Sequence, residues 1–128
     1  MNELSNDILL YRAISKKRWI DPENGVIQPV AFELRFRQQI QQYERGVSCD
    51  LIPNLCYQYI DKCFGIIELC VGDVRALGLE VDNDHDSHVN IINFPNPDLE
   101  EKEYKSILDK LGQKARLYQN WLDNPRRR

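Results

Sequence analysis

Both histidines of the chain and three aspartates lie together in EVDNDHDSHVNI, residues 80–91. The aspartates occupy alternate positions, as the first carboxylate ligands of an EF-hand calcium loop do: Asp82, Asp84 and Asp86. That loop also needs a glycine at its sixth position and a bidentate glutamate at its twelfth. This sequence has Ser87 and Asn93 there. An EF-hand site is therefore excluded.

The two histidines suggest a transition-metal site as another interpretation. His85 and His88 could bind one ion together with Asp84 or Asp86, because a loop allows residues three apart to converge. The apolar alternation on both sides instead indicates a polar loop between two strands, and we expect no metal there. His88 directly precedes the apolar VNII. It is either a structural histidine at a strand start, which we favour, or a catalytic acid–base residue.

A second candidate site centres on an arginine within an apolar run. DILLYRA, residues 7–13, predicts a buried strand that carries Tyr11 and Arg12. A buried guanidinium is costly unless it is paired or faces a cleft. It could pair with an acid such as Glu68 or Asp50, or it could clamp a phosphate or pyrophosphate in bidentate fashion.

The cysteines do not form a recognisable metal or disulfide pattern. They are spaced seven residues apart, with no CxxC pair: Cys49, Cys56, Cys63 and Cys70. We expect reduced, mostly buried thiols in a cytoplasmic protein. The start of the chain lacks a signal-peptide pattern, and no apolar run approaches the length of a membrane span.

Composition predicts an ordinary folded domain rather than a nucleic-acid-binding one. The chain has 128 residues, 42% of them hydrophobic and 29% charged, with a formal net charge of −3. Basic residues do cluster at 16–18, at Arg35 and Arg37, and at 126–128. The acidic balance makes binding to nucleic acid an unlikely role for these clusters.

The periodicity of apolar residues predicts a single α+β domain over residues 1–128. Five or six short, mostly antiparallel strands are expected, at 7–13, 26–32, 47–51, 64–71, 79–82 and 88–94. Short helices are expected at 52–63 and 72–78, where Gly78 would supply a left-handed stop. A long amphipathic helix over 98–123 is expected to close the chain and pack on the sheet.

An ordered set of short motifs carries a family resemblance. The motifs are LYRAI (10–14), VAF (30–32), GVSCD (46–50), GDVRALGLEV (72–81) and HVNI (88–91). Together they resemble a group of small, uncharacterised bacterial proteins. The Leu-Tyr-Arg strand is also similar to that of ADP-ribosyltransferase-like and RES-type toxins. That resemblance implies that Arg12, with Tyr11, would hold the pyrophosphate of NAD, that Ser48 would lie on the second motif strand, and that Glu68 would be the catalytic acid.

The sequence contains no P-loop, GxSxG, HExxH or GxGxxG motif. We therefore expect a small cytoplasmic bacterial protein that acts by binding another protein and needs no cofactor. Its partner would be encoded nearby, in a toxin–antitoxin or defence locus. The alternative is an NAD-using ADP-ribosyltransferase-like enzyme, with Glu68, Ser48 and His88 as catalytic residues. A third hypothesis is a nucleic-acid-binding accessory protein.

Overall fold

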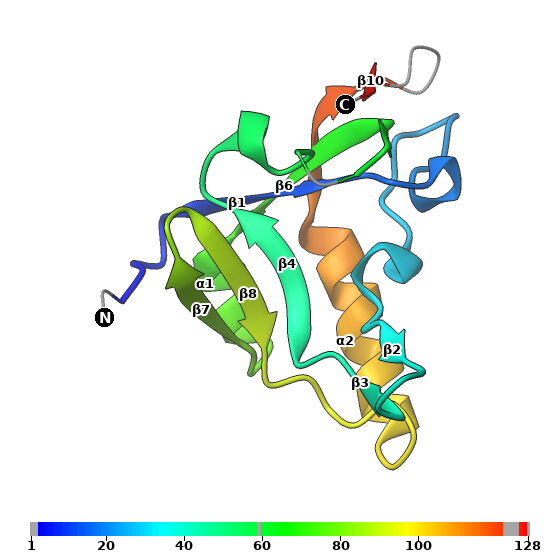
Figure 1. The fold of residues 1–128 in the computed structure, drawn as a ribbon, viewed down its shortest axis with the longest axis vertical. Helices are drawn as coiled ribbons and strands as arrows, with labels where there is room; N and C mark the ends of the chain where they lie inside the picture. Colours follow the sequence, from blue (N-terminus) through cyan, green and yellow to red (C-terminus); the bar gives the residue numbers. More distant parts are fainter. Residues whose placement is uncertain (1–2, 59, 122–125, 128) are drawn as a thin grey trace.

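The computed structural model describes residues 3–58, 60–121 and 126–127. Its main feature is a six-stranded antiparallel sheet in the order β7-β8-β4-β1-β6-β9, shown in Figure 1. Two small sheets pair β2 with β3 and β5 with β10. The strands are β1 Leu9–Ala13, β2 Phe36–Arg37, β3 Gln42–Tyr43, β4 Gly46–Asp50, β5 Lys62–Cys63, β6 Gly65–Cys70, β7 Glu80–His85, β8 His88–Ile92, β9 Arg116–Asn120 and β10 Arg126–Arg127.

The helices are few and short. Two are α-helices, α1 Val71–Ala76 and α2 Glu101–Lys114, and three are 3-10 turns, η1 Lys17–Trp19, η2 Pro29–Phe32 and η3 Pro53–Leu55. None of the described helices is long and apolar enough to cross a membrane. Helix α1 ends before Gly78, whose φ of 87° lies in the left-handed region, so the predicted glycine stop is confirmed.

The predicted α+β fold with a long C-terminal helix packed on the sheet is wrong, because the protein is mostly sheet. The helix expected over 98–123 covers only Glu101–Lys114, and the chain then continues as β9 along the edge of β6. Positions 122 and 123 of that predicted helix lie outside the described residues. If β6 were an edge strand, its outer backbone N–H and C=O groups would have no hydrogen-bond partner within the sheet. Pairing with β9 supplies those hydrogen bonds, and their stabilisation outweighs the helical periodicity of residues 116–120.

Helix α2 contributes its apolar stripe to the core and approaches η2 closely. Tyr104, Leu108 and Leu111 are buried in the main hydrophobic cluster. Gly112 allows the close approach, since a Cβ there would lie 2.7 Å from the carbonyl oxygen of Ile27. The stripe predicted from the sequence is thus correct for these residues, although the helix is much shorter.

Two proline-containing segments also differ from expectation. Residues 26–32 were expected to form a strand, but Pro29 begins the 3-10 turn η2 instead. Residues 52–63 were expected to form a helix, but the described part of this segment, which leaves out residue 59, has only η3 around Pro53 before the chain reaches β5. Proline pre-sets the φ of a helical first turn and removes a backbone donor, so both segments adopt single tight turns.

The central sheet bends where β1 meets β4. β1 pairs with β6 along its whole length, from Leu9 opposite Cys70 to Ala13 opposite Ile66. Its register with β4 is a single pair, Tyr11 opposite Asp50. Figure 1 shows β4 running steeply across the direction of β1, with β8 and β7 beside it. This divergence of the strands creates the space in which a cavity forms.

Candidate functional site

A cavity of about 490 Å³ lies where β1, β4 and the β7–β8 turn approach the segment after η3. A volume of this size is within the range of small-molecule sites. Among the residues that line it are three that the NAD-enzyme alternative assigns to the site: Arg12, Ser48 and His88. The fold therefore brings together residues from three strands that are widely separated in the chain.

Arg12 is bound to backbone carbonyls and not to an acid. Its Nε donates to the carbonyl oxygen of Ala31 at 2.9 Å, and its Nη1 donates to that of Ser48 at 2.8 Å. Its guanidinium carbon lies 5.3 Å from the centre of the Trp19 ring, a cation–π arrangement. Burial lowers the pKa of Arg12, an effect opposed by nearby Cys49, Cys56 and Glu44. Arg12 thus ties β1 to η2 and β4, and two of its N–H groups are already used.

Two thiols in the cavity wall are held in the neutral form. Burial raises the pKa of Cys49 to about 11, against the opposing effect of Arg12. Burial, together with Cys63, Asp50 and Cys49, raises the pKa of Cys56 to about 12. Since the thiolate is the reactive form, neither side chain is set up as a nucleophile at neutral pH.

Glu68 and Tyr11 lie on the other face of the sheet from Arg12. Glu68 is paired with Tyr11 across β1 and β6, while Arg12 is paired with Ile67. Successive side chains of a strand point to opposite faces, so Glu68 faces away from the guanidinium. Tyr11 packs edge-on against Tyr118 with ring centres 5.0 Å apart. The structure therefore places Glu68 beside Tyr11 but on the other face of the sheet from Arg12, with which it would have to act on NAD.

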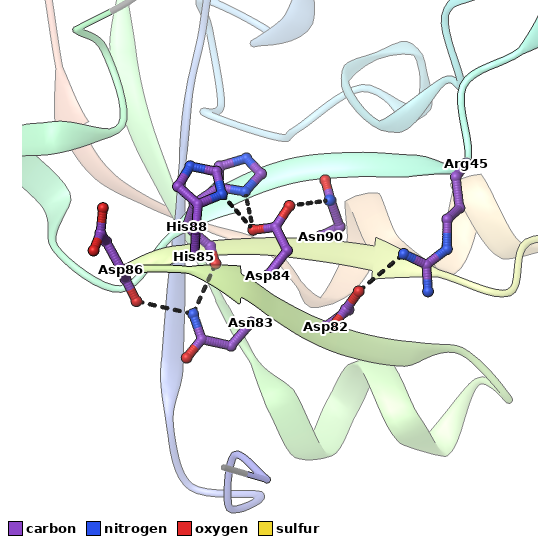
Figure 2. A network of polar contacts seen from close by, with 8 residues as sticks. All are labelled: Arg45, Asp82, Asn83, Asp84, His85, Asp86, His88 and Asn90. Atoms are coloured by element: carbon purple, nitrogen blue, oxygen red, sulfur yellow. Dashed lines mark hydrogen bonds and ion pairs between the residues drawn. The ribbon is translucent and has the colours of Figure 1, made fainter. Parts of the chain in front are cut away.

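The tip of the β7–β8 hairpin forms a cluster at the rim of the cavity. The Nδ1 of His88 lies 2.6 Å from Oδ1 of Asp84, and the Nδ1 of His85 lies 3.1 Å from the same oxygen. The two imidazole rings are stacked, with centres 4.8 Å apart and an angle of 19° between their planes. Figure 2 shows both rings lying over the Asp84 carboxylate.

A β-bulge brings these side chains to one face. Asp82 pairs with Asn90 and His85 with His88, so the two residues between Asp82 and His85 oppose one residue of β8. In a regular strand Asp84 and His85 would point to opposite faces. The extra residue re-aims one of them, as bulges commonly do. Strand alternation alone could not have shown this.

Asparagines hold the cluster in place. Nδ2 of Asn90 donates to Oδ2 of Asp84 at 3.0 Å, which leaves Oδ1 facing the histidines. Nδ2 of Asn83 donates to the carbonyl oxygens of Asp86 and His88 across the turn (Figure 2). Partial burial raises the pKa of Asp84, but the hydrogen bond from His88 and the charges of His88 and His85 outweigh it, so the pKa is lowered overall.

A second surface lies beside α2, which the sequence did not indicate. The β2–β3 groove, as we name it, is an open depression formed by the β2–β3 hairpin and the segment before α2. Its apolar lining consists of Leu34, Phe36, Tyr43, Phe94, Pro95 and Pro97. Ile40 at the hairpin turn is 61% exposed, and Leu99 in the neighbouring segment is 86% exposed. Figure 1 shows this hairpin well away from the tip of β7–β8.

Comparisons of this chain with protein-family models, with curated proteins and with solved structures find no match.

Proposed function

We propose that this protein acts in the cytoplasm by binding another protein, and that the β2–β3 groove is the surface it uses. The observation that carries the proposal is the exposure of two large apolar side chains that adjoin the groove in the chain: Ile40 precedes the lining residue Gln41, and Leu99 lies between the lining residues Asp98 and Glu100. Apolar groups exposed together around a depression are typical of protein-binding surfaces.

The groove is shaped by contacts within the chain. Phe36 and Tyr43 pack edge to face across the hairpin, with ring centres 5.0 Å apart. The Tyr43 hydroxyl donates to Oδ1 of Asp98 at 3.3 Å, which joins the hairpin to the segment before α2. Both walls are thereby connected before any partner binds, and a connected surface loses less entropy on binding than two independent loops.

The charges around the groove indicate the chemistry of the partner. Asp98 accepts from the Tyr43 hydroxyl, and Glu100 accepts from the backbone N–H of Asn96, and neither of these contacts is an ion pair. Two of the nearby arginines are already in ion pairs, Arg37 with Glu44 and Arg45 with Asp82. A partner segment that is apolar in its centre and flanked by lysine or arginine would complement this arrangement.

The test measures binding to the protein encoded next to this one, by calorimetry with both purified. We expect Ile40→Asn to weaken binding at least about 10-fold, since removing a central apolar anchor typically costs more than 1 kcal/mol. Ile52→Asn is the matched control, because Ile52 is 46% exposed but lies outside the β2–β3 groove. The affinity of the Ile52→Asn variant for the partner protein should equal that of wild type.

Two results would overturn the proposal. One is equal binding by wild type and Ile40→Asn, which would move the interface elsewhere. The other is an absence of binding both to the neighbouring gene product and to a synthetic apolar peptide flanked by lysines. A thermal shift on adding NAD would favour the enzyme alternative instead.

A further inference from the structure

We infer that Asp84, His85 and His88 form a binding site for a divalent transition-metal ion of the Zn²⁺ type. One ligand atom from each of the three residues lies within 4.8 Å of the other two. The inference concerns the β7–β8 hairpin and stands independently of the β2–β3 groove.

The spacing of the ligand atoms is close to what a metal requires. Bonds of about 2.0–2.1 Å at tetrahedral angles place neighbouring ligand atoms roughly 3.3 Å apart. The separation from Asp84 Oδ1 is 3.1 Å for Nδ1 of His85 and 2.6 Å for Nδ1 of His88. Small rotations of side chains that already converge would therefore admit an ion.

The ligand types select the class of metal. Imidazole nitrogen with one carboxylate suits Zn²⁺, Ni²⁺, Cu²⁺ and Fe²⁺, whereas Ca²⁺ and Mg²⁺ require mostly oxygen ligands. Two Nδ1 atoms directed at one carboxylate oxygen form a set of three donor atoms that a shared cation would complete.

The surrounding residues would hold the ligands in the required orientation. Asn90 binds the carboxylate oxygen of Asp84 that does not face the histidines. Asn83 braces the turn through the carbonyl oxygens of Asp86 and His88. Hydrogen bonds from outside the ligand set orient metal ligands and strengthen metal binding. The arrangement is therefore more than two exposed histidines on a flexible loop.

The ion would lie at the rim of the cavity. His85 and His88 both line it, together with Asp86, Asp50 and Arg12. Three protein ligands leave at least one position of a tetrahedral ion open to water or to a small ligand. A metal here would thus be reached from the cavity, as in sites that bind an exchangeable ligand.

Calorimetric titration of the full, untagged, reduced chain with ZnCl₂ tests the inference, and we expect one ion per chain. His85→Ala should weaken binding about 10-fold or more. His85 is 67% exposed, so this variant should fold normally, as circular dichroism can verify. Asp109→Asn is the control, because Asp109 is exposed on α2 and lies outside both the cluster and the cavity. The zinc affinity of this variant should equal that of wild type.

The cysteines need a separate readout, because thiolates also bind zinc. Titration with Co²⁺ should give a spectrum without thiolate charge-transfer bands, and nuclear magnetic resonance should show both imidazoles perturbed. Thiolate bands, or equal affinity of wild type and His85→Ala, would overturn the inference. Absence of binding at millimolar metal would overturn it as well, and so would a loss of affinity in Asp109→Asn as large as that in His85→Ala.

Discussion

The β7–β8 and β2–β3 hairpins differ in how their tips are supported. β7 and β8 belong to the six-stranded sheet, and their tip is polar and held by hydrogen bonds from Asn83 and Asn90. β2 and β3 have two residues each and form a sheet of their own, with Ile40 exposed at the turn. The first tip uses its polar groups internally and is organised to receive an ion. The second leaves apolar surface that only another molecule can cover.

The difference teaches that exposure has a different meaning in the two regions. His85 is exposed but directed at Asp84, so its orientation is determined by the chain itself. Ile40 is exposed and the polar network around it, Arg37 with Glu44 and Tyr43 with Asp98, lies at the base of the hairpin. The comparison can be tested by four changes, described in order of decreasing effect on stability.

Gly46→Ala should lower stability most, because Gly46 has no room for a side chain. Gly46 begins β4, shortly after the β2–β3 hairpin. A Cβ at this position would collide with the backbone carbonyl oxygen of Ile91 on β8. We expect a loss of about 3 kcal/mol in the free energy of unfolding, measured with urea. Gly25→Asn is the control, since Gly25 has a φ of 71° and open space around it. If Gly46→Ala were as stable as wild type, β8 would be able to shift and accommodate the added methyl group at little cost.

Arg12→Ala should cost about 2 kcal/mol by the same measurement. It removes hydrogen bonds to Ala31 in η2 and Ser48 in β4, and thereby a link between η2, which precedes β2, and β4, which pairs with β8. Arg12→Lys keeps the charge but cannot reproduce the two-pronged geometry, so it should be intermediate. If Arg12→Lys were as stable as wild type, the guanidinium contacts would not matter.

Asp84→Asn should cost about 1 kcal/mol at pH 7, since the contacts of Asp84 are partly exposed to solvent. The lowered pKa of Asp84 predicts the pH dependence. Its contribution is present above the unfolded pKa of about 3.9 and is lost as the pH falls through the lower, folded pKa. Urea unfolding of both proteins from pH 5 to pH 2 should show the difference disappearing with acid. A difference that grows over this range would contradict the prediction.

Ile40→Asn should have the smallest effect on stability, within about 0.5 kcal/mol, because the side chain is largely exposed. Its predicted effect is on partner binding alone. Thermal unfolding of the isolated protein should therefore match wild type. A clear loss of stability would show that Ile40 supports the hairpin, and would weaken its assignment to a docking surface.

Local signals in the sequence identified the parts of the fold that depend on neighbouring residues. The apolar run at 64–71 predicted β6, and the alternation at 88–94 predicted β8. Gly78 was recognised as the stop of α1. Pro29 and Pro53, in contrast, were read as parts of longer elements, although each begins a 3-10 turn.

The candidate sites depended on contacts between distant residues. The sequence placed Arg12, Ser48 and His88 among the residues of interest, and the fold brings them to one cavity. The sequence offered two partners for Arg12, an acid such as Glu68 or Asp50 and a bound phosphate, whereas the acceptors in the structure are the carbonyl oxygens of Ala31 and Ser48. Every residue has such a carbonyl, so residue types alone could not reveal these partners.

The sequence by itself determined that the chain has a buried central strand, a polar link between β7 and β8, and an apolar stripe on α2, because each follows from local periodicity. Only the tertiary structure decided that α2 stops at Lys114 so that β9 can pair with β6. It also decided, through a bulge, that Asp84 joins His85 and His88 on one face. Strand pairing and bulges are set by the backbone of a partner strand, which local periodicity does not encode.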